Sequence, residues 1–351
     1  MNTNTTDRGR LKTAGIALLL AGMIVLPFMV KNFTVFQLNM VIVYAIAILG
    51  LNMLTGWNGQ ISLGHGAFFA IGAYTTGILM SHAGMPWWVT LPVAAVVCFV
   101  FGALMGFPAL RLAGHFLALA TFALAVAVPQ LLKNKAVEGW TGGVMGLVLS
   151  KPEPPFSMTV FGQSLSPERW LYLVSLAVAA LMFLLAWNIL RGRVGRAMIA
   201  IRDHPIAATA MGVNLPRFKT LTFGVSAAYT GVAGALSAVV VAFVSPDSFN
   251  FFLSISLLVG VVIGGLASIP GAIFGAAFIQ FIPNVADQIS KSAPWAIYGI
   301  FLIVFMYLMP TGVMGMLRLI GAKMRRPRAA ATGVRPVVSA MDAQAVPTTR
   351  R

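Results

Sequence analysis

A small set of hydrogen-bonding side chains is embedded among long apolar runs in this sequence. Amide, hydroxyl and imidazole groups can exchange hydrogen bonds with a small polar molecule, and an imidazole can also take up a proton or bind a metal ion. The other histidines show no ligand spacing with His65, so the pattern does not support a metal site. Two interpretations of His65 stay open, a neutral side chain packed against a neighbouring helix and a group that contacts a passing molecule. The candidate residues for such contacts are Asn52, Gln60, Ser62, His65 and Thr121.

The composition indicates what kind of structure must hold these side chains. Of the 351 residues, 59% are hydrophobic and 9% are charged, whereas roughly 25% are charged in an average soluble domain. A helix needs about 20 consecutive apolar residues to cross a bilayer, because hydrocarbon offers its backbone no hydrogen-bond partners. The sequence therefore predicts an all-α, polytopic membrane bundle with about ten transmembrane segments. The predicted spans are 14–30, 35–54, 61–82, 87–107, 113–132, 170–190, 218–243, 252–268, 271–289 and 294–310.

Glycines indicate where these helices pack and where they break. Pairs spaced four apart, such as Gly102 and Gly106, place two small residues on one helix face and predict close packing there. Two glycine-rich stretches, 56–66 and 264–271, separate apolar runs, and we expect broken or re-entrant helices at both. Irregular backbone is tolerated at membrane depth only inside protein or beside a wet cavity, and transporters often build pathways from broken helices. These stretches add Gly64, Gly264 and Gly265 to the candidate residues of a translocation pathway.

Positive charges predict the orientation, because the cytoplasmic flanks of membrane helices collect Lys and Arg. Basic residues precede the first span, fill the loop 191–219 and follow the last span, and about ten spans place all three groups on one side. We therefore expect a multi-pass membrane protein with both termini in the cytoplasm. The net charge of +16 then reflects topology and contact with anionic membrane lipid, and no nucleic-acid partner is implied. The expected organisation is a cytoplasmic N-terminus at 1–13, a transmembrane domain at 14–318, and a basic, disordered cytoplasmic tail at 319–351.

The basic loop 191–219 shows the signals of two short helices. Apolar and basic positions mix between Arg196 and Arg202, Pro205 begins a second helix, and Gly212 ends it. The second helix carries small side chains flanked by arginines, which favours insertion into a groove on another protein. A helix lying on lipid would instead carry Trp, Phe or Leu on its buried face.

This loop resembles the cytoplasmic coupling loop of the branched-chain amino acid ABC transporter permeases. ABC importers generally carry a Glu-Ala-Ala-x-x-x-Gly signature in the loop, and Ala207, Ala208 and Gly212 hold its small positions here. Ile206 stands where the Glu would be, a departure that looks usual for the branched-chain group. The resemblance in the loop rests on Gly195-Arg196-Ala197, Ala200-Ile201-Arg202-Asp203, Ile206-Ala207-Ala208 and Met211-Gly212-Val213-Asn214.

The resemblance extends over nearly the whole membrane region and suggests the longer of the two permease subunits that pair in such transporters. Two positions depart from the family pattern. After Thr121 the family commonly has a Glu followed three residues later by a basic residue, where this chain has Val126 and Pro129. This departure weakens any substrate contact carried over for that helix and leaves room for a different cargo. Further matching blocks are 50–56, 59–69, 72–74, 110–114, 141–143, 245–249, 261–265 and 298–315.

The resemblance implies a permease subunit of the bacterial inner (plasma) membrane that forms the pathway for branched-chain or related amino acids together with a second homologous permease. Two ATP-binding cassette subunits would dock on the loop and bind ATP and Mg, and a periplasmic or extracellular solute-binding protein would deliver the cargo. This chain itself would hold no cofactor, no metal and no catalytic residue, which agrees with the absence of a Gly-Lys dipeptide and hence of a P-loop. The coupling residues implied in the loop are Gly195, Arg196, Ala197, Arg202, Asp203, Ala207, Ala208, Met211 and Gly212.

Three alternatives remain beside an importer of branched-chain amino acids. Urea, a short amide or another small polar solute would suit a permease of the same class nearly as well. A secondary transporter driven by an ion gradient usually needs a carboxylate inside the membrane, and only Asp287 lies near a predicted span. A membrane scaffold without transport would leave the broken helices unexplained.

Overall fold

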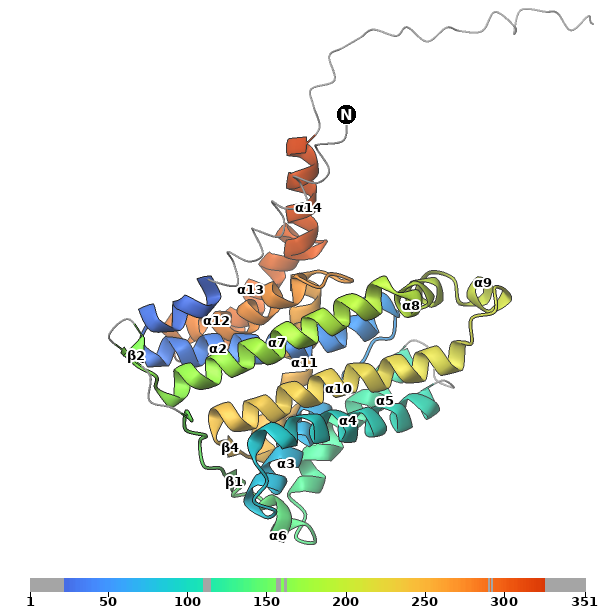
Figure 1. Cartoon of the computed structure of the whole chain (residues 1–351). Coiled ribbons are helices and arrows are strands. Elements are labelled where there is room, and N and C mark those ends of the chain that lie inside the picture. Colours follow the sequence, from blue (N-terminus) through green and yellow to red (C-terminus); the bar gives the residue numbers. More distant parts are fainter. Residues whose placement is uncertain are drawn as a thin grey trace, which may run out of the picture.

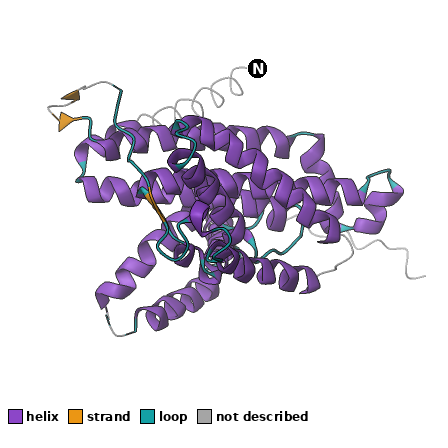
Figure 2. Ribbon diagram, turned by 90° about the horizontal axis from the view of Figure 1, so that it is seen from below, coloured by secondary structure: helices purple, strands orange, loops and turns teal. Residues whose placement is uncertain are grey.

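The computed structural model describes residues 22–109, 115–155, 159–160, 163–289, 291 and 293–325. In this part of the chain nearly all regular structure is helical, and the strands are pairs of two residues (Figures 1 and 2). The predicted all-α membrane class is confirmed. The strands form two antiparallel pairs, β1 (Leu147–Val148) with β4 (Phe243–Val244) and β2 (Thr159–Val160) with β3 (Gln163–Ser164).

Long apolar helices form the body of the molecule. Six of the described helical segments are long and apolar enough to cross a membrane, and α5 and α11 are shorter apolar helices. They coincide with the predicted spans to within a few residues at most ends. The long helices are α2 (Asn32–Asn52), α3 (His65–Ser81), α4 (Trp87–Ala109), α5 (His115–Leu132), α7 (Pro167–Arg191), α10 (Leu215–Val241), α11 (Phe251–Gly264), α12 (Gly271–Ile289), α13 (Pro294–Leu308) and α14 (Gly312–Arg325).

Short elements connect these helices. A π-helical turn, η1, extends α2, and two short helices, α8 and α9, occupy the basic loop as the sequence predicts. Proline and a side-chain cap begin several helices: Asn214 Oδ1 accepts a hydrogen bond from the Arg217 nitrogen (3.1 Å) at the start of α10. The short helices are η1 (Met53–Trp57), α6 (Glu138–Thr141), α8 (Arg193–Asp203), α9 (Pro205–Ala210) and η2 (Pro246–Phe249).

Helix α10 lies at the centre of the bundle and packs against α2, α3 and α4. Small residues along it allow close approach, as expected where interhelical contact depends on van der Waals packing. A Cβ at Gly72 of α3 would overlap the Gly231 backbone, and one at Gly102 of α4 would overlap Ala227. The predicted close packing at Gly102 and Gly106 is confirmed, since a Cβ at Gly106 would lie 3.1 Å from Thr220 Cα.

The two apolar helices that flank the stretch 264–271 fold back on each other. Gly260 and Gly264 of α11 face Gly275 and Gly271 of α12, and a Cβ on Gly264, Gly271 or Gly275 would meet the backbone of the opposite helix. The predicted break at this stretch is therefore present, and its two arms pack backbone to backbone.

Three boundaries differ markedly from the prediction, and one predicted span lies partly outside the described residues. Helix α3 begins at His65 and not at 61, because the preceding residues run as irregular chain. Helix α11 ends at Gly264, earlier than 268, because Gly265 has a φ of +112°. The tail expected to be disordered from 319 begins inside α14, whose amphipathic sequence continues the helix to Arg325. Of the span 14–30, only 22–29 is described as helix, and 1–21 and 326–351 lie outside the described residues.

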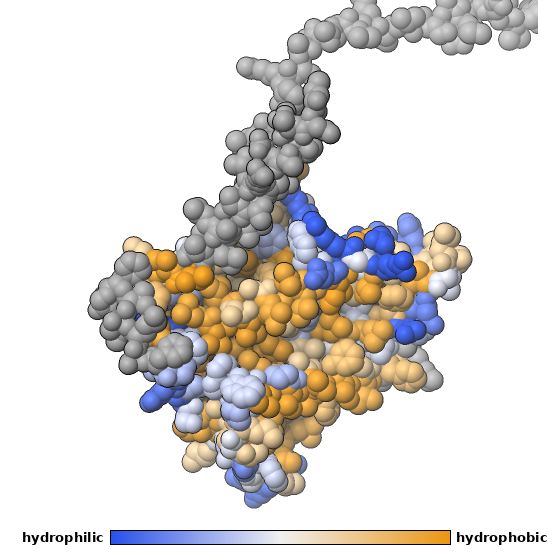
Figure 3. Space-filling model, viewed as in Figure 1, coloured by the Kyte–Doolittle hydropathy of each residue, from blue (hydrophilic) through white to orange (hydrophobic). Residues whose placement is uncertain are grey.

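Hydrophobic residues cover the sides of the long helices in Figure 3, and hydrophilic residues gather near the α8 and α9 end. Exposed apolar side chains on α4, α5, α7 and α13 contribute to this pattern. A wide apolar girdle with polar ends is the surface that hydrocarbon and its two interfaces require. Composition and fold therefore define an integral membrane protein.

Candidate functional site

Asn52 joins the two glycine-rich stretches. It is the last residue of α2 and is fully buried. Its Nδ2 donates hydrogen bonds to the carbonyl oxygens of Gly265 (3.3 Å) and Ser268 (3.1 Å), and its Oδ1 accepts one from the Ala267 nitrogen (3.0 Å). The break between α11 and α12 deprives these groups of helical partners, and buried backbone groups must be paired. One side-chain amide thus satisfies the break and holds it against the end of α2.

Gly56 allows the broken helix to approach this closely. Beyond Asn52 the chain widens into the π-helical turn η1, a form found frequently at functional sites. A Cβ at Gly56 would overlap Asn52 Oδ1 and lie 2.5 Å from the Ala267 nitrogen. Any larger residue would therefore separate the two glycine-rich stretches.

Arg202 connects the basic loop to the same place. Its Nη1 donates a hydrogen bond to the Gly56 carbonyl oxygen (2.8 Å), and its Nε donates one to Asp203 Oδ1 (2.9 Å). The aliphatic part of Arg202 packs on Gly59, where a Cβ would lie 2.9 Å from Arg202 Cγ. A chain of direct contacts therefore runs from the loop through Gly56 and Asn52 to the break between α11 and α12.

His65 lies at the start of α3 with both ring nitrogens in hydrogen-bond contact. Its Nδ1 is 3.0 Å from Ser62 Oγ and its Nε2 is 2.7 Å from Ser226 Oγ. Ser226 donates its single hydroxyl hydrogen to the Gly50 carbonyl oxygen (2.6 Å), so Nε2 must carry a hydrogen and donate it to Ser226. Nδ1 then accepts from Ser62. These bonds describe a neutral histidine that ties α3 to α10 and α2, which supports the packing interpretation.

Thr121 fastens α5 to the first glycine-rich stretch. Its Oγ1 accepts a hydrogen bond from the Leu63 nitrogen (3.0 Å) and lies 3.1 Å from the Leu117 carbonyl oxygen of its own helix. Gly64 packs on the same residue, since a Cβ there would lie 2.8 Å from the Thr121 carbonyl oxygen. On the opposite side, the Gly66 nitrogen donates to Ser254 Oγ of α11 (2.8 Å). The stretch is therefore held between two helices.

Two buried side-chain amides in the first glycine-rich stretch have atoms without hydrogen-bond partners. Within the described residues, the Oδ1 and Nδ2 of Asn58 have no hydrogen-bond partner, and the Nε2 of Gln60 has none either. Both residues are buried. Buried polar groups without partners are costly and rare, so each is a candidate for contact with a solute or with another subunit.

The structure brings the candidate pathway residues together but encloses them. Asn52, Ser62 and His65 are fully buried. Asn52 bonds to backbone groups, and His65 bonds to Ser62 and to Ser226 of α10. They form a junction of α2, α3, α10, α11 and α12 within this chain.

The basic loop presents one face to the chain and another to the outside. Gly195, Met198 and Ile201 are buried where α8 packs on the end of α7 and on η1, and Ala197 is half-buried. Ala208 of α9 is also buried, at 4% exposure, whereas Ala207 is exposed. The sequence predicts docking through both alanines, but their positions on a one-and-a-half-turn helix differ, and only Ala207 faces outward.

Two apolar side chains are exposed on α9 and at the residue that follows it. Ile206 is 88% exposed and Met211 is 86% exposed. Gly212 follows with a φ of +85°, which ends the helix and turns the chain toward α10. Arg196 is also exposed, and its Nη1 contacts the Arg191 carbonyl oxygen at 3.4 Å. The loop therefore presents apolar knobs with positive charge beside them.

Sequence reasoning missed the serines that complete the junction. Ser226 and Ser254 lie inside apolar helices and are buried. Their only signal is a hydroxyl, among small residues for Ser226 and among large apolar ones for Ser254, and such a hydroxyl also occurs where Ser merely allows close packing. Their roles became evident only from the contacts with His65 and Gly66.

The apolar girdle and the broken helices joined to the basic loop define a polytopic membrane protein with the features of a transporter. The chain belongs to the family described as branched-chain amino acid transport system permease component, whose model matches residues 33–309.

Named relatives agree with this membership. The chain is 33% identical to the high-affinity branched-chain amino acid transport system permease protein LivM of Salmonella typhimurium over 312 residues, 83% of this chain and 72% of that protein. LivM of Escherichia coli is 34% identical over 312 residues, again 83% of this chain and 72% of that protein. LivH of Escherichia coli is 23% identical over 300 residues, 78% of this chain and 91% of that protein. The chain thus resembles LivM, the longer permease, more than LivH. No solved structure matches the chain.

Proposed function

We propose that this permease forms the translocation pathway of an ATP-driven importer for branched-chain or related amino acids. The cargo assignment rests on family membership and on the names of the LivM and LivH relatives. The loop 191–219 faces the cytoplasm of a bacterial cell, as its positive charge favours, and both termini lie on that side.

The contact from Arg202 to Gly56 is the observation that carries the coupling mechanism. A movement of α8 pulls on the carbonyl of Gly56, one residue from the end of the π-helical turn. Gly56 itself lies so close to Asn52 that a Cβ there would overlap Asn52 Oδ1. Asn52 in turn holds the break between α11 and α12. Motion imposed on the loop therefore reaches the broken helix through rigid, directly bonded groups, which is the physical requirement for a two-state gate.

The partners follow from the outer surface of the loop. Two ATP-binding cassette subunits bind ATP and Mg and hydrolyse the nucleotide. One of them docks on α9 of this chain. Ile206 and Met211 fill its groove in the helix-in-groove manner. A second homologous permease completes the pathway, and a solute-binding protein delivers cargo at the opposite membrane face. This chain is non-catalytic.

A gradient-driven transporter fits the structure less well. Its carrier would be a carboxylate enclosed in the bundle. Asp287, the acid nearest to a predicted span, is exposed near the end of α12. Urea or a short amide remains the alternative cargo for the same machinery.

Co-purification of the tagged chain from native membranes, followed by an ATPase assay in lipid, tests the proposal. We expect a second permease, two ATP-binding subunits, and ATP hydrolysis that increases with a leucine-loaded binding protein. Recovery of the chain alone, with leucine uptake that follows a proton or sodium gradient, would contradict it. A binding protein loaded with urea or an amide would keep the importer and replace the cargo.

A further inference from the structure

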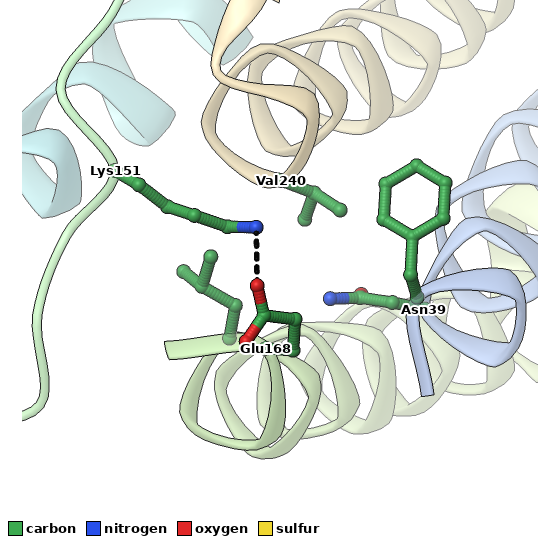
Figure 4. Close-up of a pocket in the computed structure, with 6 residues that line it drawn as sticks. Asn39, Lys151, Glu168 and Val240 are labelled. Carbon is green, nitrogen blue, oxygen red and sulfur yellow. Dashed lines mark hydrogen bonds and ion pairs between the residues drawn. The ribbon is translucent and has the colours of Figure 1, made fainter. Parts of the chain in front are cut away.

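A second polar cluster lies at the opposite end of α7 from the loop. It comprises Lys151, Glu168 and Asn39, from the segment after β1, the first turn of α7, and α2, respectively. In Figure 4, Lys151 and Asn39 extend toward Glu168 from different sides. Helix α7 has 25 residues, so at 1.5 Å per residue roughly 37 Å separates this cluster from the loop. In the proposed orientation the cluster therefore faces the side from which cargo arrives.

The ion pair in this cluster is accessible and weakly held. Lys151 Nζ is 3.0 Å from Glu168 Oε1, and the two side chains are 30% and 28% exposed. Ion pairs in contact with water contribute little to stability, so this one can open at small cost. The gaps around the pair are narrower than a water molecule. A ligand therefore enters only when the pair separates.

Asn39 supplies an unused acceptor beside the pair. The residue is 1% exposed, and its Oδ1 has no hydrogen-bond partner among the described residues. Leaving such an acceptor unsatisfied is costly. Asn39 lines the cleft that Lys151 and Glu168 close, with Phe36, Leu171 and Val240 as apolar neighbours, and its amide nitrogen points toward Glu168 in Figure 4.

We propose that Lys151, Glu168 and Asn39 form an entry site for the zwitterionic head group of an α-amino acid. The ammonium group of the ligand binds Glu168 and, after the Asn39 amide turns over, donates to its Oδ1, and the ligand carboxylate binds Lys151. One internal ion pair is exchanged for two with the ligand, so no charge is left unpaired. The apolar neighbours leave the ligand side chain an apolar surface. A neutral amide such as urea offers neither charge and leaves both residues unpaired, so the site selects the zwitterion.

This inference rests on the proposed function and specifies its cargo. Its test is uptake of radiolabelled leucine by the complete transporter, with basal ATPase activity measured on the same preparations. The key variant is Asn39→Leu, which keeps the ion pair, has nearly the same shape, and removes the buried Oδ1 that lacks a partner. We expect normal insertion and basal ATPase activity, and an apparent KM for leucine raised about tenfold, as for the loss of a charged hydrogen bond. Glu168→Gln and Lys151→Met should raise it about ten- to a hundredfold.

The double variant Lys151→Glu with Glu168→Lys distinguishes an entry site from a latch, that is, an ion pair that only holds two segments together. A latch regains its ion pair and transports like the wild type, whereas the entry site places the ammonium away from Asn39 and stays impaired. The control pair, Lys133 and Asp247, is also solvent-accessible, and Lys133→Met should leave the KM within twofold of the wild type. Normal uptake by Asn39→Leu, or full recovery in the double variant, would overturn the entry site. Absence of ATP-dependent leucine uptake in the wild type would instead refute the proposed function.

Discussion

Arg202 of the basic loop donates a 2.8 Å hydrogen bond to the carbonyl oxygen of Gly56, 146 residues earlier in the chain. Gly56 lies against Asn52, and Asn52 is bonded to the break between α11 and α12. The loop that resembles a coupling loop is therefore joined to a broken helix by two side chains and one glycine. This short connection accounts for several properties that can be measured separately.

Asn52→Leu should destabilise the fold strongly. It leaves two carbonyl groups and one N–H of the break without their buried partner, and we expect a loss of at least about 2 kcal/mol. Unfolding by SDS in mixed micelles measures this change. Asn284→Leu is the matched control, because Asn284 is exposed on α12 and donates only to Gln280 of its own helix. The control should change stability by about 0.5 kcal/mol or less. Similar losses in both variants would show that Asn52 does not hold the break.

Gly56→Ala should impair folding or transport although it adds only a methyl group. The added Cβ overlaps Asn52 Oδ1 and presses on the Ala267 backbone, and backbone cannot rotate away as a side chain can. Gly299→Ala in α13 is the control, since no atom lies within 4 Å of a Cβ placed there. Uptake and the yield of monodisperse protein should fall for the first variant and stay unchanged for the second. Equal behaviour of the two would remove the argument for close contact at Gly56.

Two neighbouring alanines of α9 should give different defects. Ala207→Arg alters an exposed position, so the chain should insert and fold normally while the ATP-binding subunits bind poorly. Ala208→Arg forces a charge into a buried position and should reduce the stability of the loop itself. Co-purification of the ATP-binding subunits, together with protease sensitivity of the loop, distinguishes the outcomes. Normal co-purification with Ala207→Arg would place the docking surface elsewhere.

Helix positions were predictable because hydrocarbon imposes a simple rule on sequence. A span must be apolar over its whole length, and the runs that became α4, α7 and α10 satisfy that rule independently of their neighbours. The start of α3 was misplaced because Ile61 and Leu63 are apolar although their backbone is irregular. Apolar composition alone does not distinguish helix from irregular chain held inside protein. Helix α14 was missed because its basic residues removed it from the search for spans.

The sequence predicted which segments form the candidate site, but not which of their residues contact one another. The glycine-rich stretches and the loop carry unusual residues, so their involvement could be inferred from the sequence. Pairing Asn52 with Ser268 or Arg202 with Gly56 requires contacts across 216 and 146 residues, which no local pattern contains. The inward direction of Ala208 depends on how α9 is attached to α8, and a run of small residues gives no sign of it.

The coupling of ATP hydrolysis to uptake in the Arg202→Met variant tests the central claim most directly. The complete transporter is reconstituted in liposomes, and leucine transported per ATP hydrolysed is compared for the wild type, Arg202→Met and the control Arg193→Met, which removes an exposed charge from the same helix. We expect Arg202→Met to hydrolyse ATP at a near-normal basal rate and to transport about tenfold less leucine per ATP, as for the loss of a charged hydrogen bond. The control should couple like the wild type. Wild-type coupling in Arg202→Met would contradict the proposed connection between the loop and the broken helix.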